Sequence, residues 1–154
     1  AVIRNENRVS PTDPESPRCL QLETAMGSAI ECFDGAESVV VTRERFAPVK
    51  KTTDLLALWS DAYEVTPDAR MVAVDPEANR TRVIELDERY YGHLDQLEAR
   101  FPHGAPSLAK CRRLSIVGDH HFGRDVSIVG DVRLENEGDT PVQIPDGAIL
   151  DGDR

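Results

Sequence analysis

A six-residue repeat near the end of the chain limits its fold more than any other feature of the sequence. Apolar residues recur at every sixth position, in two phases. The first phase is Ile116, Phe122, Ile128 and Leu134, and the second is Leu114, Val126 and Val132, with His120 in the gap. The segment Ser115–Asp119, with the sequence SIVGD, is repeated at Ser127–Asp131. Short strands that turn every six residues are typical of a hexapeptide parallel β-helix, and a plain β-meander fits this spacing less well.

The repeat is short for a β-helix. Three hexads make one coil, so Leu114–Asp131 accounts for about one coil. The polar segment Glu135–Thr140 then interrupts the register, and Val142, Ile144 and Leu150 resume it. Because each coil buries its apolar face only against a neighbour, so small a β-helix needs further protein to pack against.

The sequence before the repeat alternates helical and strand patterns, which indicates an α/β domain. The expected helices are Cys19–Phe33, Asp54–Tyr63 and a third that Asp87 caps and that continues to Phe101. The expected strands are a short Val2–Ile3, a doubly buried Ser38–Thr42, and a hairpin of Met71–Val74 with Arg82–Leu86. We therefore predict an α/β domain over residues 1–108 and a parallel β-helix over residues 109–154.

The connection between the second strand and the second helix is a candidate phosphate site. Four of the chain's 18 basic residues gather in it, namely Arg43, Arg45, Lys50 and Lys51. Thr53 and Asp54 mark the helix start, so the lysines come just before the N-cap, where unpaired N–H groups and the helix dipole favour an anion. In a chain of formal net charge −10, this local positive charge is a natural place for a phosphate. The alternative is a solvated loop whose lysines bind nothing.

The composition argues against several other classes of protein. No apolar run approaches the roughly 18 residues of a membrane span, and the excess of acidic residues argues against a non-specific nucleic-acid binder. The three cysteines, Cys19, Cys32 and Cys111, are too far apart for a paired-cysteine metal site and odd in number for a disulfide framework. A reducing, cytoplasmic setting therefore fits best. No metal site is expected at His120 and His121, because adjacent residues of a strand point to opposite faces.

Five segments, taken in order, resemble the eukaryotic-type UTP–glucose-1-phosphate uridylyltransferases, or UDP-glucose pyrophosphorylases. They are Leu20–Gly27 (LQLETAMG), Phe46–Leu56 (FAPVKKTTDLL), Ser60–Tyr63 (SDAY), Phe101–Gly104 (FPHG) and Ile144–Ala148 (IPDGA). The resemblance covers nearly the whole chain. One departure lies beside the key residue, because Lys51 stands where the family pattern has a threonine, which leaves Lys50 as the matching lysine.

The resemblance implies that this chain is the C-terminal part of a longer enzyme that transfers a uridylyl group between UTP and glucose 1-phosphate. It implies a Rossmann-like nucleotidyltransferase domain followed by a left-handed β-helix. Lys50 is then the expected catalytic residue, a charge clamp on the phosphates, and Lys50 and Lys51 are the expected phosphate ligands. The Gly-rich nucleotide-binding loop of the family is missing from this sequence, so the segment alone is expected to be inactive.

The resemblance also implies partners and a cofactor. Mg²⁺ would be required, held by residues outside this chain, so no metal ligand is expected here. The expected partners are UTP, glucose 1-phosphate, UDP-glucose and the missing N-terminal catalytic region, with no nucleic acid and no membrane. Two alternatives remain open. One is a non-catalytic module that forms homo-oligomers through the exposed edge of its β-helix, and the other is a pyrophosphorylase for an N-acetylhexosamine 1-phosphate.

Overall fold

The computed structural model describes residues 2–24, 26–42 and 48–152. The chain divides into two units, residues 1–46 and residues 47–154, and each is considered by itself. Its mixture of helices with parallel strands confirms the predicted α/β class. Arg43 and Arg45 of the predicted basic loop, together with Phe46 and Ala47, lie outside the described residues.

The first unit contains an antiparallel hairpin. β1 (Val2–Arg8) pairs with β2 (Arg18–Thr24) along the whole length of both strands. The connection is held by Ser16, whose hydroxyl accepts the N–H of Ser10 at 2.8 Å and whose carbonyl accepts a guanidinium N–H of Arg8 at 2.7 Å. The strand expected at Val2–Ile3 is therefore confirmed, and it is longer than predicted.

The predicted helix Cys19–Phe33 is wrong in its first half. That half is strand β2, and only the 3-10 helix η1 (Met26–Cys32) follows it. Leu20 and Leu22 alternate with polar residues, a spacing of two that suits a strand, while the wider spacing from Leu22 to Phe33 suits a helix. The hydrogen bonds that β1 offers decide in favour of the strand, and the sequence of this segment alone does not contain that information.

The predicted strand Ser38–Thr42 is also wrong. The segment has no regular secondary structure and pairs with no strand among the described residues. Val39, Val40 and Val41 are 86%, 94% and 63% exposed. The run of valines was expected to be buried on both faces, and the described part of the chain supplies no neighbour that covers it.

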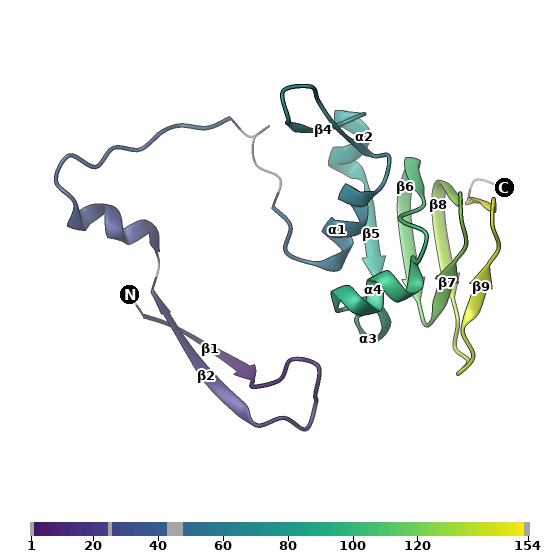
Figure 1. Cartoon of the computed structure of the whole chain (residues 1–154), viewed down its shortest axis with the longest axis horizontal. Coiled ribbons are helices and arrows are strands. Elements are labelled where there is room, and N and C mark those ends of the chain that lie inside the picture. The colour runs from purple at the N-terminus through teal and green to yellow at the C-terminus, as the bar shows by residue number, and fades with distance from the viewer. Residues whose placement is uncertain (1, 25, 43–47, 153–154) are drawn as a thin grey trace. The chain divides into compact units, whose positions relative to one another are not determined.

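The second unit is built on parallel strands. Its main sheet has the order β10–β8–β6–β5, and Figure 1 shows β5, β6 and β8 side by side. The bounds are β5 (Val83–Leu86), β6 (Ser107–Val117), β8 (Ser127–Glu135) and β10 (Ile149–Asp151). A separate parallel pair joins β7 (His120–Phe122) to β9 (Val142–Ile144). All of these pairs are parallel, which excludes the plain β-meander.

The register of these strands follows the six-residue repeat. Arg113 lies opposite Asp131 and Ile116 opposite Leu134, an offset of eighteen residues, or three hexads. For β7 with β9, and for β8 with β10, the offset is twenty-two residues. The four additional residues lie in the polar loop after β8. Asn136 anchors that loop, because its amide donates to the carbonyls of Asp119 and Thr140, each at 2.9 Å.

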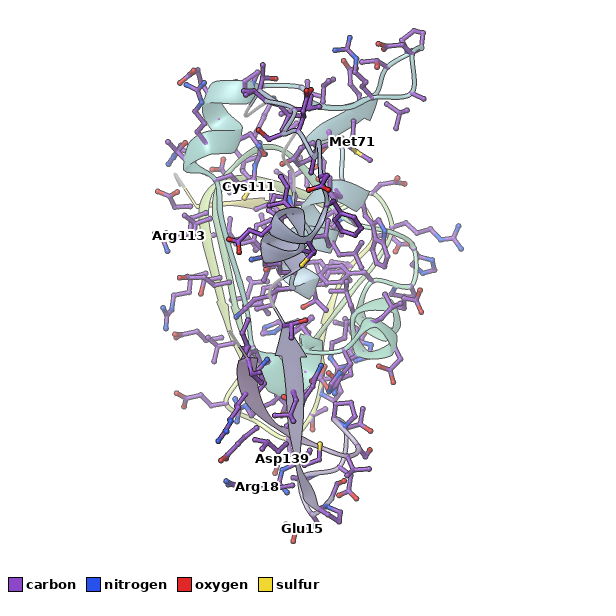
Figure 2. The ribbon with its side chains drawn as sticks, turned by 90° about the vertical axis from the view of Figure 1, so that its left-hand side faces the viewer. Glu15, Arg18, Met71, Cys111, Arg113 and Asp139 are labelled. Atoms are coloured by element: carbon purple, nitrogen blue, oxygen red, sulfur yellow. The ribbon has the colours of Figure 1, made fainter. Side chains whose placement is uncertain are left out.

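The apolar positions of the repeat form the core of this unit, as the spacing predicts. Six of them are at most 6% exposed, namely Leu114, Ile116, Phe122, Val126, Ile128 and Val132. Arg112, Arg113 and Arg133 are exposed, and Figure 2 shows the Arg113 side chain directed away from the strands. Gly118, in the repeated SIVGD segment, has φ +81°, and a Cβ there would lie 2.0 Å from the carbonyl oxygen of Asn136. Only glycine fits this corner.

The predicted hairpin of Met71–Val74 with Arg82–Leu86 is wrong. β4 (Met71–Ala73) pairs with β3 (Tyr63–Val65) across the turn that begins at Thr66, and β5 instead joins β6 in parallel. The segment between β4 and β5, expected as a turn, contains helix α2 (Pro76–Thr81). Its N-cap Asp75 accepts the N–H of Ala78 at 3.0 Å. An Asp–Pro pair starts helices as well as turns, so this local signal fits both.

The predicted helix from Asp87 to Phe101 is two helices, α3 (Glu88–Tyr91) and α4 (Leu94–Arg100). Asp87 caps the first of them, as predicted, by accepting the N–H of Arg89 at 3.1 Å. The break turns Tyr91 into the core, where its hydroxyl donates to the carbonyl of His120 at 3.0 Å. The apolar spacing Tyr90, Leu94, Leu97 and Phe101 predicts that all four lie on one buried face, but Leu94 is 51% exposed.

Candidate functional site

The lysine pair leads directly into helix α1 (Thr52–Trp59), which covers most of the predicted Asp54–Tyr63. The helix begins at Thr52, two residues earlier than expected, so Lys51 is itself the N-cap. Asp54 accepts the backbone N–H groups of Lys50, at 2.9 Å, and of Lys51, at 3.0 Å. The carboxylate of the first turn thus satisfies the two backbone N–H groups that precede the helix, and it places a negative charge at the helix end where a phosphate was expected.

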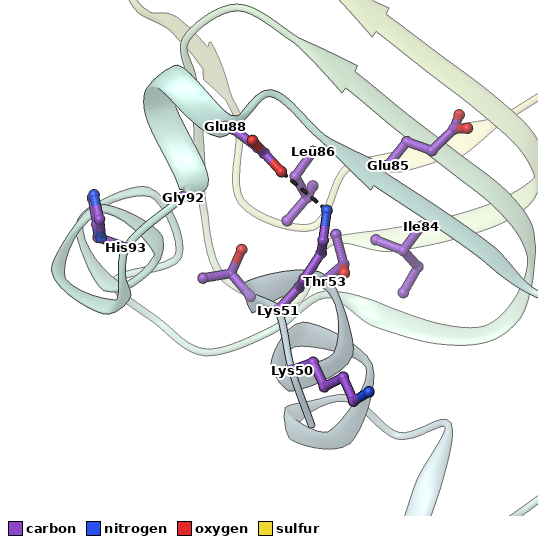
Figure 3. Close-up of a pocket in the computed structure, with 10 residues that line it drawn as sticks. Lys50, Lys51, Thr53, Ile84, Glu85, Leu86, Glu88, Gly92 and His93 are labelled. Carbon is purple, nitrogen blue, oxygen red and sulfur yellow. Dashed lines mark hydrogen bonds and ion pairs between the residues drawn. The ribbon is translucent and has the colours of Figure 1, made fainter. Parts of the chain in front are cut away.

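A cavity of about 500 Å³ opens beside this helix start (Figure 3). Three parts of the second unit line it: the lysine segment, strand β5, and the α3–α4 region. The lining residues are Lys50, Lys51, Thr52, Thr53, Ile84, Glu85, Leu86, Glu88, Gly92 and His93. The sequence singled out the lysines and Thr53 from local charge and helix signals. It gave no signal for Glu85, Glu88 or His93, because only the packing of α1 on β5 brings them to the lysines.

The lysines and carboxylates of this cavity are paired, with one exception. The Lys51 ammonium lies 3.0 Å from Oε1 of Glu88, and Glu85 lies 3.1 Å from the Arg113 guanidinium. Within the described part of the chain, the Lys50 side chain has no ion pair and no hydrogen bond. Figure 3 shows it directed away from the Lys51–Glu88 pair. Lys50 is exposed, so its charge is available to an anion.

Comparison with known proteins gives a consistent result for nearly the whole chain. Residues 1–129 match the family model described as UTP–glucose-1-phosphate uridylyltransferase. This chain belongs to the UTP–glucose-1-phosphate uridylyltransferase family. The family's potato member, from Solanum tuberosum, is 35% identical over 142 residues, which are 92% of this chain and 29% of the relative. The Saccharomyces cerevisiae member is 33% identical over 150 residues, 97% of this chain and 29% of the relative.

Two solved structures extend this similarity to the fold. A UDP-glucose phosphorylase from Trypanosoma brucei has a TM-score of 0.84 and 45% identity, over 99% of this chain and 32% of that one. A UDP-glucose pyrophosphorylase variant from Leishmania major, in complex with UDP-glucose, has a TM-score of 0.78 and 44% identity, over 98% of this chain and 32% of that one. The chain therefore spans less than a third of the length of these relatives, and it corresponds to a C-terminal portion of them.

Two other features of the structure bear on the expected partners of this family member. No helix in the described ranges is long and apolar enough to cross a membrane. In the same ranges, no group of three or more His, Cys, Asp or Glu side chains could hold a metal ion. We assign no chemical step of this chain to a metal.

Asp61, in the SDAY segment that resembles the family, fixes the end of helix α1 to the sheet. Its Oδ1 accepts the N–H groups of Leu108, at 2.7 Å, and Ala109, at 3.0 Å, and its Oδ2 accepts the Ser107 hydroxyl at 2.6 Å. These three donors belong to the first residues of β6. One carboxylate thus ties the residues after α1 to the beginning of the longest strand.

We expect Asp61→Ala to lower the free energy of unfolding by about 2 kcal/mol, because it removes three hydrogen bonds to a charged acceptor at a partly exposed site. Urea denaturation of the purified protein, followed by circular dichroism, measures this change. The control is Asp139→Ala in the exposed loop after β8, which should stay within about 0.5 kcal/mol of the unmodified chain. Equal losses in the two variants would show that the Asp61 bonds add nothing specific.

Asp87 makes a similar connection between α3 and the sheet. It accepts the N–H of Gly118 at 3.0 Å and pairs with the Arg89 guanidinium at 2.6 Å, and its side chain is only 11% exposed. The hydrogen bond from Arg89 is the largest influence on this carboxyl and lowers its pKa to about 2, with help from the Gly118 N–H and against the effect of burial.

This pKa makes part of the stability dependent on acid. The folded pKa of Asp87, about 2, is below the ordinary value of 3.8, so the unfolded chain takes up protons first as the pH falls. The contribution of Asp87 is complete above about pH 4 and is lost as the pH falls through about 2. We expect roughly 1–2 kcal/mol, allowing for the exposed position of Arg89.

The measurement is the free energy of unfolding by urea between pH 2 and pH 6, compared with the Asp87→Asn variant. The variant is expected to be less stable at pH 6 and to approach the unmodified protein near pH 2. A constant difference over the whole range would mean that the Asp87 charge has no part in stability.

Proposed function

We propose that this chain is part of an enzyme that transfers a uridylyl group between UTP and glucose 1-phosphate, giving UDP-glucose and pyrophosphate. The observation that carries the proposal is the 44% identity, over 98% of this chain, to a Leishmania major enzyme solved with UDP-glucose. Because the chain spans less than a third of such relatives, the activity belongs to the full-length protein.

Within this proposal Lys50 is the catalytic residue. Uridylyl transfer moves negative charge onto the phosphate oxygens, and a flexible ammonium neutralises that charge without a fixed geometry. Lys50 suits this role because it lines the cavity and, of the lysines and carboxylates described there, it alone has no partner. The sequence predicts Lys51 as a second phosphate ligand, but its ammonium pairs with Glu88, which favours Lys50 as the phosphate contact.

The remaining parts of the proposal concern regions beyond this site. Mg²⁺ would be held by the missing N-terminal catalytic region, and we expect a cytoplasmic enzyme.

Residues 109–154 would form a short left-handed parallel β-helix after the α/β domain of residues 1–108. The offset of eighteen residues between β6 and β8, three hexads, supports the β-helix. The outer strand β10 would then offer an edge for homo-oligomers, the alternative that requires no catalysis.

The test is an assay of the full-length protein, whose intact mass is first checked by mass spectrometry. We expect pyrophosphorolysis of UDP-glucose to be faster than that of UDP-N-acetylglucosamine, and we expect none from residues 1–154 alone. Preference for the N-acetylhexosamine substrate would favour the alternative pyrophosphorylase. Turnover by residues 1–154 alone would contradict the assignment of the nucleotide-binding groups to the missing region.

A further inference from the structure

The two neighbouring lysines of the cavity are in different electrostatic states. Lys51 is held by Glu88, which comes 37 residues later in the sequence and lies in the first turn of α3. Lys50, one residue earlier, has no side-chain partner within the described residues. The backbone N–H groups of both are fixed by Asp54, and their ammonium groups lie in different places.

The Lys51–Glu88 pair is exposed, and this limits its strength. The two side chains are 69% and 79% exposed. In water such a pair favours the closed state by only roughly two- to five-fold over the open one. Glu88 therefore does not lock Lys51, and loss of the Glu88 charge is enough to release a second ammonium beside the cavity.

We infer that Glu88 is a positioning residue that biases Lys51 away from the phosphate groups of the substrate, so that Lys50 is their main contact. The inference rests on the proposed function of the cavity. Its physical basis is the pairing of the cavity charges: Lys51 with Glu88 and Glu85 with Arg113 cancel within the wall, and Lys50 remains. A second free ammonium would bind the phosphates of substrate and transition state alike, and such uniform binding lowers KM without raising kcat.

The experiment uses the full-length protein in the UDP-glucose pyrophosphorolysis direction, with inorganic pyrophosphate as the varied substrate. We expect Glu88→Gln to lower KM for pyrophosphate by roughly two- to five-fold at low salt and to leave kcat unchanged or lower. The effect should shrink in 0.5 M NaCl, because salt screens exposed charges. Glu88→Asp should restore most of the original KM.

The deciding comparison repeats Glu88→Gln in a Lys51→Thr background, where we expect no change in KM. The matched control is Glu85→Gln, which removes a carboxylate from the same cavity wall but one that pairs with Arg113. Its effect should be smaller and independent of Lys51. A Glu88→Gln effect that persists without Lys51, or no effect at all, would overturn the inference. Failure of the proposed function is distinguished by Lys50→Ala, which would then leave kcat/KM unchanged.

Discussion

Lys50→Ala in the full-length protein is expected to lower kcat/KM for UDP-glucose pyrophosphorolysis by roughly 10²-fold or more. The variant removes the one lysine of the cavity that has no carboxylate partner in the described structure, and with it the charge that would neutralise the phosphate oxygens in the transition state. An interaction that strengthens as charge develops affects kcat, so both kcat and kcat/KM should fall. Because Lys50 is exposed and its side chain has no partner among the described residues, the free energy of unfolding should hardly change.

The control is Lys51→Ala, one residue away on the same loop. Lys51 contributes an exposed ion pair, so its loss should change kcat/KM only a few-fold. Both variants remove a lysine side chain, and the two positions are adjacent in the sequence. They differ in whether the ammonium group is free to contact a phosphate. Small and equal effects at both positions would mean that the loop is merely solvated, which is the alternative that the sequence left open.

Phe101→Ala is expected to cost about 3–5 kcal/mol of unfolding free energy. Phe101 is 4% exposed and stacks on Phe122 with ring centroids 4.6 Å apart. The Tyr91 ring is tilted against Phe101, with ring centroids 6.0 Å apart. The three rings come from α3, from the end of α4 and from β7, so one side chain joins both helices to the repeat. Truncation would leave a cavity that rigid strands on one side prevent from closing.

Urea denaturation with tyrosine and tryptophan fluorescence measures this loss. Leu94→Ala is the matched control, because Leu94 lies in the same helix and is 51% exposed. It should cost less than about 1 kcal/mol. Comparable losses in the two variants would show that α4 is held by something other than the aromatic contact with β7.

Sequence-based prediction is correct here where a segment has a single apolar periodicity, and it fails where a strand period and a helix period both fit the segment. The six-residue spacing from Leu114 has no helical equivalent, and the buried positions follow it. Asp87 as a cap was also predictable, since capping involves only the next few residues. The segment after Cys19 fits both a strand and a helix, and β1, a separate part of the chain, decides between them. Val39–Val41 was predicted to be a buried strand because it is a run of apolar residues, but the described structure leaves these three side chains exposed.

In the candidate site, residues that are adjacent in the sequence were predicted, and a residue that only the fold brings close was not. Lys50 and Lys51 were found because their charges are adjacent in the sequence. Glu88 was missed because it reaches Lys51 only after β5 has paired with β6 and α1 has packed on β5. No periodicity records such a contact. The sequence also does not show that the Asp54 carboxylate turns back to accept the backbone N–H groups of Lys50 and Lys51.

The four additional residues in the loop after β8 have a consequence for how this part of the protein tolerates change. The strands on either side keep their parallel pairing although the offset grows from eighteen to twenty-two residues. Asn136 closes the base of the loop through its own amide, so the length beyond it is not fixed by the sheet. Each doubling of a flexible loop costs only about 0.6 kcal/mol. This corner is therefore a suitable point for evolution, or for an engineer, to insert a peptide without disturbing the lysine cavity.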